Sequence, residues 1–176
     1  ALRAFYKASI EEAKAKGVIW SLHLKATMMK ISDPIMFGYG FVAFFEDVFA
    51  KHADTFKELK VNPNLGMSDL EKKIKGHAKE AEIKADFLAA LESDSPKLAM
   101  VDSDKGTTNF NASNDIIIDA SMPVVVREGG KQWDRTGAAC ECVAVIPDST
   151  YGMFHAEMVA DCVKHGQYDV TTMGTM

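Results

Sequence analysis

Apolar residues follow helical spacing in the first third of the chain. Residues 5–16 have a helical composition and end at Gly17, a residue type that often stops a helix. Six apolar residues then fall on one face of a helix that reaches to about His52. They are Phe37, Phe41, Phe44, Phe45, Val48 and Phe49. This face predicts a surface that packs into the core rather than an aromatic binding box.

A second amphipathic stretch follows the turn cluster NPNLG at residues 62–66. Ser68 and Glu71 have the spacing of a capping box, which predicts that a helix begins there. Apolar residues keep helical spacing to about Leu91, and the charges between them predict a solvated face. These apolar residues are Leu70, Ile74, Ala78, Ala81, Ala85 and Leu88. A last helix is predicted from about Ser149 to His165, stopped by Gly166.

Strand-like segments are interleaved with these helices. Val18–Leu24 is apolar and β-prone, and it places Lys25 at the end of a predicted buried strand. Beyond Leu98, short β-like runs read LAMV, DIIID, MPVVV and CECVAVI. The predicted strands in this part are Leu98–Val101, Ile116–Asp119 and Cys140–Ile146. The sequence therefore predicts an α/β fold, a mixed sheet covered by amphipathic helices, with residues 1–176 in a single domain.

Composition removes several classes of partner. The chain has a net charge of −5 and a pI of about 5.5. This acidic balance argues against the clustered lysine and arginine side chains that nucleic-acid binding needs. Apolar runs stay far below the roughly 20 residues that cross a bilayer. We therefore expect no nucleic acid, no membrane and a cytoplasmic location. Three cysteines at this spacing predict free thiols rather than a zinc site. The Ala1 start and the absence of a stop signal at the other end suggest a clipped chain.

The common sequence signatures of catalysis are missing. The chain has no GxGxxG, no P-loop and no GxSxG, and Gly38 and Gly40 are too weakly placed to form a phosphate cradle. The motif DSDKG at residues 102–106 is typical of a solvated turn. The histidines never form HxxxH or HxH, so a histidine-rich metal site has no support. They are His23, His52, His77, His155 and His165.

Acidic residues beside apolar strands are the remaining candidates. Asp115 and Asp119 bracket three isoleucines. A carboxylate at the exit of an apolar strand is costly to bury unless it is paired or binds a cation, so Asp119 is the better candidate for a metal ligand. The residues alone leave open whether Asp119 binds a metal or only ends a strand.

Longer blocks carry a resemblance to a known family. SLHLKATMMKISDPIMFG and FFEDVFAKH, between Ser21 and His52, are similar to the catalytic-lysine region of monomeric-type NADP-dependent isocitrate dehydrogenases. Five later blocks follow in the same order as in that family: LAMVDSDKGTTN, DIIIDASMP, AVIPDSTY, DCVKHG and DVTTMGTM. The resemblance covers essentially the whole chain, although Ser149 stands where a basic residue is expected. Since the family's proteins are several times longer, it implies a partial segment of the large domain, with an isocitrate/isopropylmalate dehydrogenase-like fold.

The resemblance also implies chemistry. It makes Lys25 the catalytic lysine and Asp119 one ligand of Mg or Mn, in an enzyme that oxidises and decarboxylates isocitrate with NADP. The serine and arginine cluster, the catalytic tyrosine, the other metal aspartates and the NADP-binding segments would lie in the remainder of the full-length enzyme. We therefore expect this segment alone to be inactive. The alternative is a noncatalytic truncated α/β module that folds or self-associates without turnover.

Overall fold

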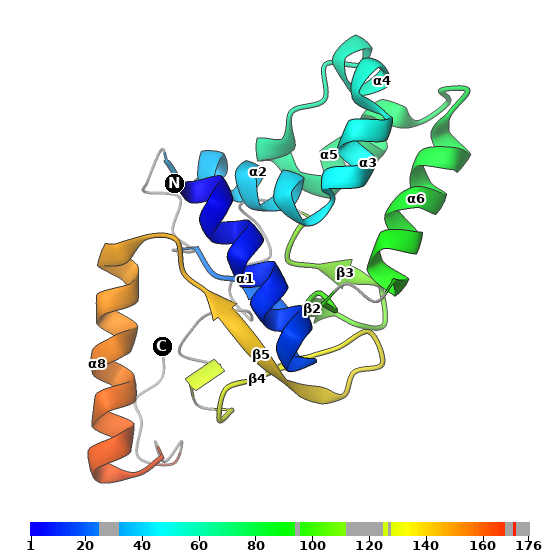
Figure 1. Cartoon of the computed structure of the whole chain (residues 1–176). Helices are drawn as coiled ribbons and strands as arrows, with labels where there is room; N and C mark the ends of the chain where they lie inside the picture. The colour runs from blue at the N-terminus through cyan, green and yellow to red at the C-terminus, as the bar shows by residue number, and fades with distance from the viewer. Residues whose placement is uncertain (25–31, 94–95, 112–124, 127, 168–170, 172–176) are drawn as a thin grey trace.

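The computed structural model describes residues 1–24, 32–93, 96–111, 125–126, 128–167 and 171. Helices predominate in the first half, and strands lie before, between and after them (Figure 1). The helical elements are α1 (Leu2–Lys16), α2 (Ser32–Phe44), α3 (Glu46–Lys51), α4 (Ala53–Glu58), the 3₁₀ helix η1 (Pro63–Leu65), α5 (Gly66–Ile74), α6 (Glu80–Glu92) and α8 (Ser149–His165). The strands are β1 (Ile19–Leu22), β2 (Met100–Asp102), β3 (Thr107–Thr108), β4 (Lys131–Trp133) and β5 (Ala139–Val145).

The strands form one mixed sheet in the order β1-β5-β4-β2-β3. β1 runs parallel to β5, with Ile19 opposite Cys142, while the other neighbours are antiparallel. The α/β prediction is confirmed, and the strand ahead of Lys25 belongs to the sheet. Three of the four predicted strands correspond to β1, β2 and β5, with shifted ends. The fourth, residues 116–119, lies outside the described residues.

One β-like run was assigned wrongly. Val125 and Val126, from the run MPVVV, are helical rather than extended. The chain must turn here to enter β4, and two backbone hydrogen bonds close the turn. Gly130 N–H donates to the Val125 carbonyl at 2.8 Å, and Gly129 N–H donates to the Val126 carbonyl at 3.1 Å. Both glycines have a positive φ, which side-chain-bearing residues rarely adopt.

Helix α1 contacts β1 and β5, and it ends as the sequence predicted. Gly17 adopts the left-handed conformation with φ 66°, and its N–H donates to the Ala13 and Lys14 carbonyls. The turn brings Trp20 of β1 back against the helix, where its indole N–H donates to Ser9 Oγ at 2.9 Å. Tyr6 packs on the edge of the same indole, so α1 is fixed to the first strand by two buried contacts.

The phenylalanine stripe forms the centre of the core, as predicted. Phe37, Phe41 and Phe45 are almost fully buried and all lie against the ring of Phe110. Trp20 stacks on Phe110 from the sheet side, with ring centroids 5.8 Å apart. The aromatic cluster therefore joins helices, sheet and the loop after β3 into one core.

The helix that carries this stripe is not continuous. α2 ends at Phe44 and α3 begins at Glu46, because Phe45 leaves helical geometry with φ −107° and ψ 36°. Because of this bend, the phenylalanine stripe packs against both the sheet and helix α4. Phe44 packs on Trp20 at 5.6 Å, while Phe49 packs on Phe56 of α4 at 5.2 Å.

The predicted single helix from Ser68 to about Leu91 is two helices, α5 and α6, separated around Gly76, whose φ is 80°. The capping box was also wrong, since α5 begins at Gly66 and Ser68 lies inside its first turn. Main-chain carbonyls of a distant loop take the place of the side-chain cap. Met67 N–H donates to Phe110 at 2.7 Å, and Ser68 N–H donates to Asn111 at 2.9 Å.

Smaller expectations are met in the described part of the chain. Residues 63–65 form the predicted turn, with Asn62 Oδ1 accepting from Asn64 N–H at 3.1 Å. α8 ends before Gly166, which has φ 94°. All three cysteines are free and half-buried. As a separate finding, no helix within the described residues has the length and apolar character needed to cross a membrane.

Candidate active site at the end of strand β1

The carboxyl end of β1 is held from two sides. His23 N–H donates to the Val145 carbonyl of β5 at 2.8 Å, continuing the parallel pairing by one residue. On the other side, Asn109 Nδ2 donates to the Leu22 carbonyl at 3.0 Å. Leu24 is buried and belongs to the hydrophobic core. The backbone is therefore anchored up to the residue that directly precedes Lys25.

Lys25 itself lies outside the described residues, as do Asp119 and its neighbour Asp115. The roles predicted for Lys25 and Asp119 therefore remain predictions. The structure describes the strand that leads to position 25, and this strand is buried along its whole length.

A serine and a histidine lie side by side on β1. Ser21 Oγ and His23 Nε2 are 2.7 Å apart, and both side chains are at most 1% exposed. A nucleophile and a base must reach substrate to act. This pair is enclosed within the fold, so it serves as a buried polar contact beside the strand end.

Asp102 also lies beside an apolar strand and is the alternative to Asp119 among the described acidic residues, but it is engaged in a turn. Its carboxylate accepts from the Lys105 backbone N–H at 3.1 Å and pairs with the Lys105 ammonium at 2.8 Å. The hydrogen bond from the Lys105 side chain is the main reason why the pKa of Asp102 lies below its usual value. The solvated turn predicted for residues 102–106 is confirmed.

A second polar cluster, which the sequence did not indicate, joins the α3–α4 junction to α6. His52 Nε2 lies 2.6 Å from Asp86 Oδ2, and the Lys51 ammonium lies 2.8 Å from the same oxygen and 3.1 Å from Glu82 Oε1. These hydrogen bonds lower the pKa of Asp86, with the Lys51 contribution first and the His52 contribution second. They also raise the pKa of Lys51.

The donor atoms of His52, Glu82 and Asp86 lie within 4.8 Å of one another, close enough to share a metal ion. Two observations favour a structural contact instead. The Lys51 ammonium already contacts both carboxylates and offsets part of their charge. In addition, His52 Nδ1 is buried and has no hydrogen-bond partner among the described residues, whereas a metal-bound histidine almost always donates its other N–H to a neighbouring group. The cluster therefore ties α6 to the helices that carry the aromatic stripe.

Comparison with known proteins identifies the family. A family model described as monomeric isocitrate dehydrogenase matches residues 1–176. The chain belongs to this family. It is 47% identical to "Isocitrate dehydrogenase [NADP]" of Azotobacter vinelandii and 46% identical to "Isocitrate dehydrogenase [NADP] 2" of Psychrobacter sp. (strain 13A), in each case across 100% of this chain and 24% of the relative.

A third relative, "Isocitrate dehydrogenase [NADP] 2" of Mycobacterium tuberculosis, is 44% identical over the same share. The chain thus spans about a quarter of the length of the isocitrate dehydrogenases that it matches. The family match confirms the resemblance carried by the sequence blocks.

Proposed function

We propose that this chain forms part of an NADP-dependent isocitrate dehydrogenase, which oxidises isocitrate and releases CO₂ to give 2-oxoglutarate. The observation that carries the proposal is the family match from residue 1 to residue 176. Relatives named as NADP isocitrate dehydrogenases, 44–47% identical over the whole chain, support it.

Lys25 is the proposed catalytic lysine of this segment. Its support is the block SLHLKATMM together with the fixed strand end, where Leu22, His23 and Leu24 are held by hydrogen bonds or by the core. A functional side chain gains precision when rigid backbone carries it. A lysine ammonium can stabilise charge developing on the substrate hydroxyl oxygen, and its pKa moves readily with its surroundings. Lys25 is thus suited to exchange a proton with that hydroxyl.

Asp119 is the proposed metal ligand. Carboxylate oxygens are the donors that hard divalent cations prefer, and Asp102, the described alternative, is already paired with Lys105. Mg or Mn, when bound, would supply Lewis-acid stabilisation of negative charge on substrate oxygens. Asp119 would contribute one ligand, and the remainder of the enzyme would contribute the others.

In this proposal, the segment is one part of a longer enzyme. Residues 1–176 form a single domain that belongs to the large domain of the longer enzyme. The remainder of the polypeptide supplies the groups that grip the isocitrate carboxylates and bind NADP. The chain's share of about a quarter of the relatives' length supports this division.

The second candidate function is a noncatalytic α/β module that folds or self-associates without turnover. Exposed apolar side chains on α8, such as Met153 and Val163, favour it, because such groups promote association when nothing covers them. It shares the family fold and differs in activity.

An assay of NADP reduction separates the two. The full-length protein, expressed from the reading frame that contains residues 1–176, should reduce NADP only with isocitrate and Mg or Mn, and EDTA should stop the reaction. Residues 1–176 alone should show no turnover. A full-length protein without isocitrate-dependent NADP reduction would overturn the proposed function. Turnover by the highly purified segment would overturn the proposed division of labour.

A further inference from the structure

Helix α8 carries three different faces. One is buried or half-buried and contains His155, Met158 and Cys162. A second is mainly polar and contains Glu157, Asp161, Lys164 and His165, with the exposed Phe154 on the same side. The third is apolar and exposed, with residues three or four apart along the helix. Its members are Met153, Ala156, Val159, Ala160 and Val163.

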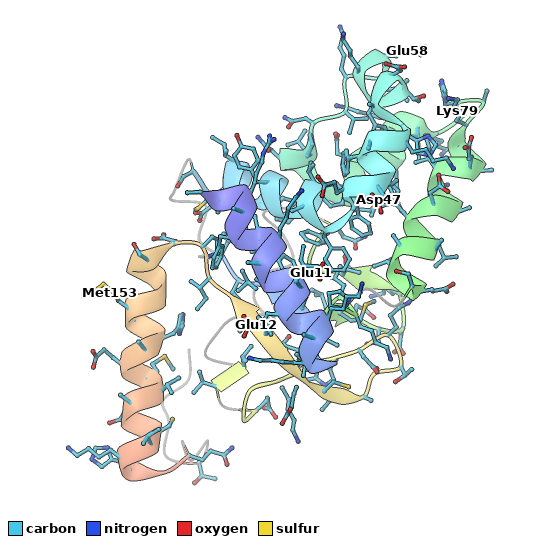
Figure 2. The ribbon with its side chains drawn as sticks, in the orientation of Figure 1. Glu11, Glu12, Asp47, Glu58, Lys79 and Met153 are labelled. Atoms are coloured by element: carbon cyan, nitrogen blue, oxygen red, sulfur yellow. The ribbon has the colours of Figure 1, made fainter. Side chains whose placement is uncertain are left out.

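The side chains of the apolar face are highly exposed and lie next to one another, unlike single apolar residues scattered over a surface. Val163 is 83% exposed, Met153 is 70% exposed and Val159 is 48% exposed. Figure 2 shows Met153 projecting away from the rest of the molecule on the outer side of α8. Contiguous apolar surface of this kind is typical of an interaction site.

An apolar groove of about 440 Å³ continues this face towards the sheet. Gly130, Cys142 and Ala144 lie along its sheet side, while Val159 and Val163 belong to both groove and face. Cys142 and Ala144 alternate with Val143, which packs against the hydrophobic core, so they point to the opposite side of the sheet. Burial raises the pKa of the Cys142 thiol to about 11, which keeps it neutral near pH 7. The groove therefore offers small and apolar contacts.

We propose that this surface, the apolar residues of α8 together with the groove, is the docking site for an apolar segment of the same polypeptide outside residues 1–176. The inference rests on the proposed function. About three-quarters of the relatives' length lies outside the stretch that this chain matches, so ample polypeptide exists to cover it. The family is described as monomeric, which favours a segment of the same molecule over a second copy.

The covering can be measured on the full-length protein through Met153. Mild peroxide oxidation, followed residue by residue with mass spectrometry, compares the folded protein with the same protein in denaturant. We expect Met153 to be oxidised far more slowly in the folded state, to the same degree at high and low protein concentration. Oxidation as fast as in denaturant would overturn the proposal. Protection that disappears on dilution would assign the surface to a second copy and would also overturn it.

A matched pair of variants adds a second readout. Val163→Gln and Lys164→Gln place the same side chain at adjacent positions, one on the apolar face and one on the polar face. If the apolar face is covered, Val163→Gln buries an amide and lowers the Tm of the full-length protein by several degrees, while Lys164→Gln changes it little. Equal Tm values for the two variants would overturn the proposal.

The proposed function is tested separately by NADP reduction in the same preparation. A protected Met153 in a protein without turnover would contradict the function and leave the docking site standing. An exposed Met153 in an active enzyme would contradict the docking site alone.

Discussion

Asn109 and Leu22 are joined by a hydrogen bond across 87 residues of sequence, with Asn109 Nδ2 donating to the Leu22 carbonyl at 3.0 Å. The bond ties the loop after β3 to the last residue of β1. Asn109 lies on one side of β1. On the other side lies β5, where the Val145 carbonyl accepts from His23 N–H. The strand end that precedes Lys25 is thus fixed by two independent partners, one of them a buried side chain.

Substitution of Asn109 tests the value of this bond. Asn109→Asp keeps the side-chain shape but replaces the donor with a carboxylate oxygen that faces the Leu22 carbonyl. We expect the full-length protein to lose about 1–3 kcal/mol in unfolding free energy, because a buried polar group loses its partner. Denaturant titration measures the loss, and Asn62→Asp, in the exposed turn before η1, is the control. Equal stability of wild type and Asn109→Asp would show that the bond contributes nothing.

The sequence correctly predicted those features of the fold that depend only on residues close together in the chain. The stripe through Phe37, Phe41 and Phe45 is apolar at helical spacing, and burial of that face follows directly from the hydrophobic effect. The end of α1 at Gly17 needs only the conformational freedom of glycine. Such features require no knowledge of what lies across the core.

Features that depend on distant partners could not be predicted. Ser68 and Glu71 have the spacing of a capping box, yet carbonyls of Phe110 and Asn111 satisfy the first turn of α5, so the helix begins earlier. His52 and Asp86 meet across 34 residues, and no local motif signals the contact. For the candidate site, Lys25 was singled out by similarity of a whole block, because its predicted position at a strand end is by itself more typical of a surface lysine.

Two glycines of α2 provide a graded test of close packing. A Cβ on Gly38 would clash with the Asn64 side chain and lie 3.0 Å from the Asn64 backbone nitrogen, whereas a Cβ on Gly40 would lie 2.8 Å from the end of the Leu22 side chain. The Leu22 methyl can move more easily than backbone. We expect Gly38→Ala to lose about 1–3 kcal/mol of unfolding free energy, and Gly40→Ala to lose less, in denaturant titration. The reverse order would contradict the assigned contacts.

The Asp86 cluster should give a pH-dependent contribution to stability. The pKa of Asp86 is below its usual value of 3.8 in the folded state, so its contribution is present above that value and is lost as pH falls through the lower, folded-state pKa. Asp86→Asn should therefore be less stable than wild type near neutral pH, and the two stabilities should converge in acid. Thermal unfolding from pH 7 to about pH 2 measures this, with Glu82→Gln as control. A constant difference across that range would exclude Asp86 as the titrating group.

Asp119 is tested by a charge-removing variant of similar shape. In the full-length enzyme, Asp119→Asn should weaken Mg or Mn binding and lower the rate at limiting metal, because a neutral amide is a poorer ligand for a hard cation than a carboxylate. Metal titration of NADP reduction gives both quantities. Wild-type metal affinity and rate in this variant would transfer the role to Asp115, since Asp102 is paired with Lys105.

Lys25 is tested most sharply against the nearest alternative lysine. Lys25→Met retains most of the side-chain stem and removes the ammonium, so proton exchange with the substrate hydroxyl is lost with little change in side-chain size. We expect the rate of isocitrate-dependent NADP reduction by the full-length enzyme to fall by about 100-fold or more, as for other general acid–base groups, with an unchanged Tm. Lys30→Met, five positions later in the same block, is the matched control and should stay near the wild-type rate. A near-normal rate for Lys25→Met beside a collapsed rate for Lys30→Met would assign the chemistry to Lys30, because only the lysine that handles the proton should be indispensable while the fold stays intact.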